Sequence, residues 1–175
     1  MNIQQRRLLF IAAIAVQLLI LIAIAIPRMI TLNHGRTVTF ETEPIDPWDL
    51  FRGDYVQMRY PFSKIPTKKD FKPSTPVFVL LQQDTPDKWR AKEILTEKPP
   101  TLGGDLLLRA RINYSSGSEA HVTYGLEQVF VAEGTGKDLG AKDRLNVDVV
   151  VDDDGNAVIT ELRHKDRKLF QWKWF

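Results

Sequence analysis

Two short segments hold most of the side chains that could do chemistry. The first runs from Asp46 to Tyr60 and combines aspartates, an arginine and a glycine ahead of an alternating, strand-like stretch. Gly53 permits a sharp entry into that strand, so Asp49, Arg52 and Asp54 could converge at one end of a sheet. Such a cluster would form an ion-pair or ligand site. Residue chemistry alone favours a simpler interpretation, in which the aspartates bind nearby backbone amides and the arginine clamps them.

The second segment runs from Tyr124 to Gly134 and contains Glu127 and Glu133. On an unbroken strand these glutamates would share a face but lie roughly 20 Å apart, too far for one catalytic step. A bend could bring them together, and a protonated carboxyl beside an ionised one would suit acid–base chemistry. Glutamates that face solvent or pair with arginine are the more common outcome, and we favour that interpretation.

Both segments interrupt a chain that otherwise reads as plain alternating strands, and such departures gather at functional or strained sites. We therefore predict that the two segments lie side by side. The planar guanidinium of Arg52 suits bidentate pairing, so we predict that it pairs with Glu127 or Glu133. Local pairing of Arg52 with Asp49 or Asp54 is the alternative.

These segments resemble the motifs of the GDYXXLXY family of bacterial membrane-anchored proteins. Gly53 to Tyr60 matches the naming motif, with Met58 in place of leucine, a swap that conserves volume. Asp46 to Tyr55 and Tyr124 to Gly134 match two further stretches of the family. The resemblance implies an extracytoplasmic domain of unassigned activity that associates with multi-pass membrane proteins, and it supplies no catalytic residue. The candidate binding or structural site comprises Asp46, Asp49, Arg52, Gly53, Asp54, Tyr55, Tyr60, Tyr124, Glu127 and Glu133.

An uncharged apolar run from Leu8 to Ile26 precedes both segments. As a helix it would extend roughly 28 Å, close to the hydrocarbon thickness of a bilayer. A cleaved signal peptide is the alternative, because Arg6 and Arg7 precede the run and Ala23-Ile24-Ala25 resembles a cleavage site. The run exceeds the usual apolar core of a signal peptide, so we predict a retained single-pass anchor. A short N-terminus before one early span usually stays in the cytoplasm, which places the following domain outside.

The rest of the chain predicts an all-β domain, a single sandwich or partly open barrel of short, mostly antiparallel strands. Asp154-Gly155 lies between two alternating apolar stretches and predicts a hairpin. The expected organisation is a cytoplasmic N-terminus at 1–7, the transmembrane anchor at 8–26, a juxtamembrane linker at 27–36 and an extracytoplasmic β-domain at 37–175. Expected strands lie at 37–42, 55–60, 77–81, 89–95, 106–114, 121–124, 145–151 and 157–162.

Composition narrows the chemistry further. The chain has 0 cysteines and 3 separated histidines, which excludes disulfides and thiolate catalysis and predicts no metal site. Lys and Arg number 24 against 22 Asp and Glu, and Arg6 and Arg7 account for the difference, so residues 27–175 are formally neutral. A neutral surface argues against nucleic-acid binding. No cofactor is predicted.

The C-terminus is rich in aromatic residues. Phe170, Trp172 and Trp174 would share one face of an extended segment, and with Phe175 they are candidate contacts for a partner or for the membrane interface. A final strand that closes the core is the alternative, which we favour because chain ends fray unless they are docked.

Taken together, the sequence favours a non-enzymatic, membrane-tethered β-domain that serves as an accessory subunit or scaffold for a multi-pass membrane partner at the bacterial inner membrane. One alternative is a cell-envelope hydrolase that uses Asp49 or Asp54 with Glu127 or Glu133. Another is a sensor that binds a small ligand or cation through the same carboxylates. Carboxyl groups about 5–10 Å apart in a cleft would favour the hydrolase. Several oxygens around one point would favour the cation site.

Overall fold

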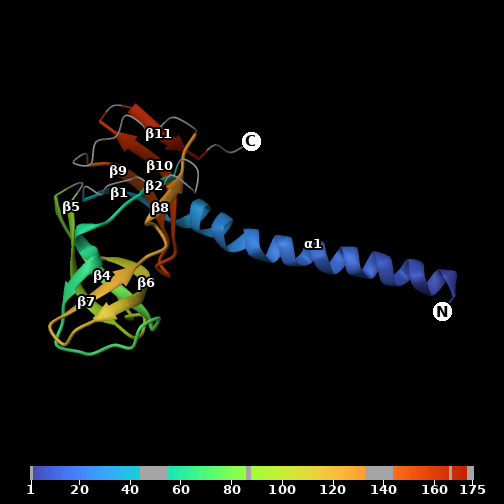
Figure 1. Ribbon diagram of the computed structural model, residues 1–175, viewed down its shortest axis with the longest axis horizontal. Coiled ribbons are helices and arrows are strands. Elements are labelled where there is room, and N and C mark those ends of the chain that lie inside the picture. Colours follow the sequence, from blue (N-terminus) through green and yellow to red (C-terminus); the bar gives the residue numbers. More distant parts are fainter. Residues whose placement is uncertain (1, 44–54, 86–87, 133–143, 166, 173–175) are drawn as a thin grey trace.

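The computed structural model describes residues 2–43, 55–85, 88–132, 144–165 and 167–172. In these residues one long helix, α1, precedes a β-domain (Figure 1). The helix and the first elements of the domain are α1 (Ile3–His34), β1 (Arg36–Glu41), β2 (Tyr55–Gln57), a 3₁₀ turn (Pro61–Ser63), β3 (Lys64–Pro66), β4 (Pro76–Thr85) and β5 (Lys88–Leu95). The remaining strands are β6 (Leu106–Ser115), β7 (Glu119–Thr123), β8 (Gln128–Phe130), β9 (Asn146–Val151), β10 (Ala157–His164) and β11 (Arg167–Gln171).

The domain is mostly β and antiparallel, as the alternating sequence pattern predicted. A four-stranded sheet has the order β1-β9-β10-β11, a five-stranded sheet has the order β3-β7-β6-β4-β5, and β2 pairs with β8. The four-stranded sheet lies at one end of the domain and the five-stranded sheet at the other (Figure 1). The edge strands β3 and β5 also contact each other, so the five-stranded sheet is nearly closed.

A cluster of aromatic rings joins the parts of the core. Phe40 of β1 is fully buried, and its ring meets those of Tyr60, Phe62 and Trp89 edge to face, with centroids 5.9, 5.0 and 6.0 Å away. The rings of Tyr60 and Phe62 stack at 5.2 Å. Aromatic pairs of this kind add to the stabilisation that burial itself provides. The cluster therefore connects the four-stranded sheet to the segment that follows β2.

The β9–β10 hairpin forms at Asp154-Gly155, which confirms that prediction. Gly155 has φ +79°, a conformation that glycine adopts without strain. The Gly155 carbonyl also accepts a 2.8 Å hydrogen bond from the backbone N–H of Arg109 in β6. A Cβ at position 155 would lie only 3.1 Å from that same nitrogen. The tip of the hairpin is thus a second connection between the two large sheets.

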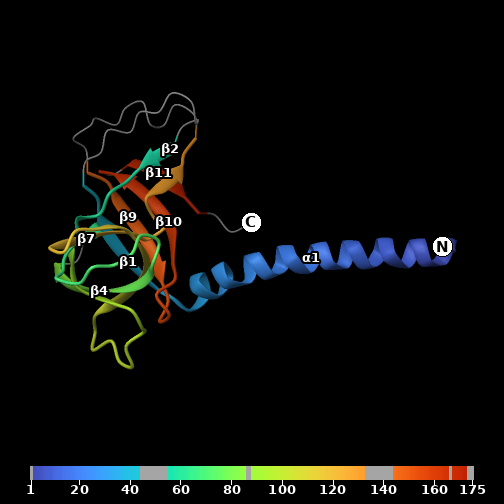
Figure 2. The ribbon, with the colours of Figure 1, turned by 60° about the horizontal axis from the view of Figure 1, so that its bottom comes forward.

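The segment predicted as a linker, residues 27–36, is helical as far as His34, so the helix runs directly into the domain (Figure 2). Proline removes one backbone hydrogen bond from a helix, and here tertiary contacts offset that loss. The side chain of Thr31 is 1% exposed, and its hydroxyl donates to Asp152 Oδ2 at 2.7 Å while the Pro27 carbonyl lies 3.2 Å away. The hairpin that begins after β9 therefore holds the end of α1.

Asp152 makes this junction sensitive to acid. Partial burial favours its neutral form, but hydrogen bonds from Asn156, from Thr31 and from the backbone amides of Asn156 and Asp154 outweigh that effect and lower the pKa of Asp152. A lowered pKa in the folded state means that the carboxylate stabilises the fold above its ordinary pKa near 4. That stabilisation is lost as the pH falls through the lowered pKa.

We expect the melting temperature of the wild-type chain to fall more steeply below about pH 4 than that of Asp152→Asn, because asparagine has no carboxylate to protonate. Thermal unfolding in detergent, measured across an acid pH series, checks this. Asp153→Asn, a change at the exposed neighbour in the same turn, should follow the wild type. Parallel curves for wild type and Asp152→Asn would contradict the assignment.

Candidate functional site: a groove beside the paired motif segments

The two motif segments pair with each other, which confirms that they lie side by side. Strand β2 is antiparallel to β8, with Tyr55 opposite Phe130 and Gln57 opposite Gln128. The Met58 N–H then donates to the Glu127 carbonyl at 2.7 Å, so the contact extends beyond the short strands. The regular strand β2 ends at Gln57, short of the predicted end at Tyr60, although the side chains of Val56, Met58 and Tyr60 share the buried face as expected.

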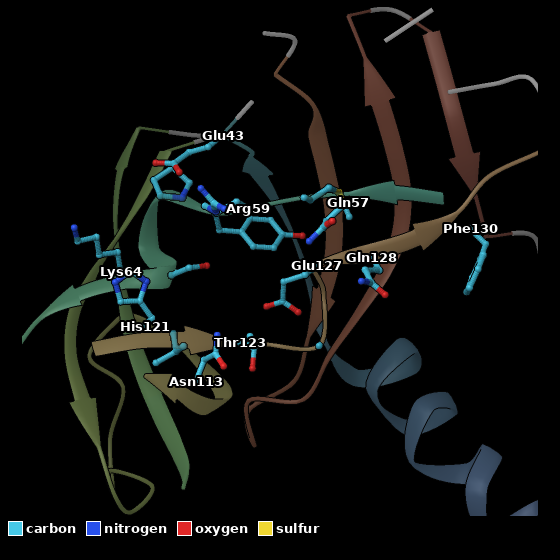
Figure 3. Close-up of a pocket in the computed structure, with 16 residues that line it drawn as sticks. Glu43, Gln57, Arg59, Lys64, Asn113, His121, Thr123, Glu127, Gln128 and Phe130 are labelled. Atoms are coloured by element: carbon cyan, nitrogen blue, oxygen red, sulfur yellow. The ribbon is translucent and has the colours of Figure 1, made fainter. Parts of the chain in front are cut away.

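A groove of about 1020 Å³ lies alongside this pair. One wall comes from β2 and β8, and the opposite wall comes from β3, β6 and β7 (Figure 3). Its polar lining residues include Gln57, Arg59, Asn113, His121, Glu127 and Gln128. Glu127 projects into the middle of the groove, and Phe130 lies at one end of it (Figure 3).

Two tyrosines, one from each motif, hold the segments together: Tyr60 is buried and Tyr124 is partly buried. The Tyr60 hydroxyl donates to the Leu126 carbonyl at 2.8 Å, and the Tyr124 hydroxyl donates to the Phe62 carbonyl at 2.6 Å. Burial, with a smaller contribution from the charge of Glu127, raises the pKa of both tyrosines well above the ordinary value. Both hydroxyls therefore stay protonated and act as donors, so these motif residues have a structural role.

Glu127 also has a structural contact. Its Oε1 accepts a 2.5 Å hydrogen bond from the backbone N–H of Tyr124. Gly125, between them, has φ +77°, which allows the chain to turn at this point. The glutamate therefore closes the turn that leads into β8, rather than lying on a straight strand. The predicted partner Arg52 lies outside the described residues, so its pairing stays a prediction.

The sequence did not predict the side of the groove that carries the basic residues Arg59, Lys64 and His121. Lys64 of β3 and His121 of β7 contact Glu119 at 3.0 and 3.2 Å. Hydrogen bonds from Lys64 first, and then from His121, lower the pKa of Glu119. Arg59 could have been found, because it alternates with the buried Met58 and Tyr60 and must therefore face outward. His121 comes from a distant strand, and no pattern in the sequence indicated that it would line this groove.

The other predicted site residues are described to different extents. Tyr55 is described only by its position in β2. Phe170 and Trp172 are described below, and the others lie outside the described residues: Asp46, Asp49, Arg52, Gly53, Asp54, Glu133, Trp174 and Phe175. Among the described residues, no group of three or more His, Cys, Asp or Glu side chains is placed to hold a metal ion.

At the C-terminus, β11 pairs with β10 and buries Leu169, so part of this segment forms a strand of the four-stranded sheet. Its buried side chain is Leu169, not Phe170 or Trp172. Phe170 is partly buried against the core, and Trp172 is 43% exposed. The face of β11 that carries Leu169 packs inward, so the neighbouring Phe170 lies on the opposite face.

Fold and site together define a β-domain that carries a groove and is joined to a helix long and apolar enough to cross a membrane. The family pattern described as GDYXXLXY protein matches residues 17–162, so the chain belongs to the GDYXXLXY family. That match includes both motif segments and extends from the second half of the apolar run to β10. No curated protein and no solved structure matches the chain.

Proposed function

We propose that this protein is a single-pass, membrane-tethered accessory subunit or scaffold, without catalytic activity, for a multi-pass membrane partner. In this proposal α1 is retained as an anchor through residues 8–26, and the β-domain lies outside the cytoplasm in the cell envelope. The groove alongside the paired motif segments binds an extramembrane segment of the partner.

The observation that carries the proposal is the position of Phe130. Its side chain is 75% exposed, although it is large and apolar, and it lies at the end of the groove. Strand β8 is on the side of the domain from which α1 leaves (Figures 1 and 2). An anchor in the bilayer would therefore present this apolar side chain toward the membrane side. Aromatic residues are enriched in protein interfaces relative to the rest of the surface, so we assign Phe130 to the contact with the partner.

The contacts of Glu127 argue against the enzymatic alternative. It is the one described carboxylate among the four that the hydrolase hypothesis requires, and it closes a turn through its bond to Tyr124. A general acid or base must place its carboxyl group within reach of the proton that it transfers. Freeing the Glu127 carboxylate for that task would break its bond to Tyr124 and so disturb the groove itself. We therefore propose no catalytic role for it.

The partner proposal can be tested by purification from native membranes in mild detergent, with a tag that leaves the groove accessible. The wild-type chain should recover a stoichiometric multi-pass protein. Phe130→Lys should lose it, because a charge replaces the apolar contact. Thr101→Lys adds the same charge at an exposed site outside the groove lining and is the matched control. Equal recovery with both variants would exclude the groove as the contact.

The topology can be tested with single cysteines, because the native chain has 0 of them. We expect Thr101→Cys to react with a membrane-impermeant maleimide in intact cells, while Gln4→Cys reacts only after the membrane is permeabilised. The reverse pattern would place the domain in the cytoplasm. A chain that begins near Ile26 would show instead that the helix is a cleaved signal.

A further inference from the structure

One polar side chain interrupts the apolar surface of α1. Gln17 lies at the midpoint of Leu8–Ile26, and every other residue of that run is apolar. Its side chain is exposed and makes no hydrogen bond to any described residue. When α1 spans a bilayer, this amide lies at the centre of the hydrocarbon core, where water cannot satisfy it.

A primary amide has both a donor and an acceptor, so it needs a partner that offers both. An unsatisfied amide in hydrocarbon is unfavourable, and polar side chains accordingly bond across neighbouring membrane helices. A second copy of this chain provides a matching group. All copies insert in the same direction, so two parallel helices bring Gln17 of each to the same depth. The amide NH₂ of each copy can then donate to the amide carbonyl of the other.

We propose that α1 self-associates as a parallel dimer through Gln17 at the membrane centre. This inference rests on the part of the proposed function in which the helix is a retained anchor. Helical spacing places Ala13, Gln17, Ile20 and Ile24 on one face. Ala13, one turn before the amide, is small enough for the two backbones to approach. Ala15 lies on the opposite face and provides a matched position for comparison.

The test uses the full-length chain in phosphatidylcholine vesicles, with donor and acceptor dyes on the introduced cysteine of Gln4→Cys. Energy transfer measured against the protein-to-lipid ratio gives the dimerisation constant. We expect Gln17→Leu to weaken dimerisation roughly 3- to 30-fold, the range that membrane hydrogen bonds support. Gln17→Asn keeps the amide and should retain most of the association. Ala13→Leu should weaken it, whereas Ala15→Leu should not.

Equal dimerisation constants for wild type and Gln17→Leu, or equal effects of Ala13→Leu and Ala15→Leu, would overturn the proposal. A wild-type chain that stays monomeric would also overturn it and would leave Gln17 to a helix of another protein. Alkaline carbonate extraction of native membranes shows whether the helix is an anchor at all, independently of whether it forms a dimer. Release of the wild-type chain would reject the anchor and the dimer together, whereas retention without dependence on Gln17 would reject the dimer alone.

Discussion

Tyr60→Ala should lower the free energy of unfolding by about 3–5 kcal/mol, the range for truncating a large buried aromatic side chain. The ring of Tyr60 is almost fully buried against Phe40 and Phe62, and its hydroxyl reaches the second motif through the Leu126 carbonyl. Removing it leaves a cavity at the junction of the sheets and an unpaired carbonyl beside the groove.

Urea unfolding in detergent, followed by tryptophan fluorescence, measures this effect. Tyr60→Phe keeps the ring and removes only the hydroxyl, so it should cost about 1–3 kcal/mol, the penalty for leaving a buried acceptor unsatisfied. Tyr114→Ala, at a tyrosine that is half exposed, is the matched control and should change stability by about 0.5 kcal/mol or less. A Tyr60→Ala protein as stable as the Tyr114→Ala protein would contradict the assigned role.

Gly35→Ala should separate the end of α1 from the β-domain. An added Cβ would lie 2.6 Å from the Thr31 carbonyl oxygen, 2.6 Å from Val150 Cγ1 and 2.9 Å from the Val151 carbonyl carbon. Two of these atoms belong to the backbone and cannot move aside as a flexible side chain would. Overpacking of this kind costs about 1–3 kcal/mol, and here undocking of the helix is the way to relieve it.

Pulsed EPR between spin labels at Gln4→Cys and Thr101→Cys would report the geometry of helix and domain together. We expect a single narrow distance distribution for the wild type and a broad one for Gly35→Ala. Gly103→Ala is the control, because Gly103 has φ +55° and open space around it, so alanine there is strained without touching the junction. A narrow distribution for Gly35→Ala would show that the junction tolerates the extra atom.

The sequence predicted those features that depend on neighbouring residues. Asp154-Gly155 favours a tight hairpin turn by its own residue types. The alternation of Val56, Met58 and Tyr60 likewise predicts a buried face from local sequence alone. Adjacency of the two motif segments was also predicted, from their shared departure from regular alternation, and β2 does pair with β8. Pairing of Arg52 stays a prediction, because it lies outside the described residues.

Features that depend on distant contacts were missed. Strand β3 has only Lys64–Pro66 and is recognisable as a strand through its pairing with β7. The helix continues past Pro27 because Thr31 bonds to Asp152, 121 positions away, and no local sequence pattern predicts that bond. The groove wall formed by Asn113 and His121 likewise exists only once β6 and β7 have joined the five-stranded sheet.

The direct junction between α1 and the β-domain has a mechanical consequence. Membrane helices tilt by about 20° on average, and the tilt follows the match between helix length and bilayer thickness. A flexible tether would absorb such tilting, but α1 enters the sheet through Thr31 and Gly35 without one. If α1 spans a bilayer as proposed, a tilt of the helix would carry the β-domain with it, so lipid thickness would set the height and angle of the groove above the membrane.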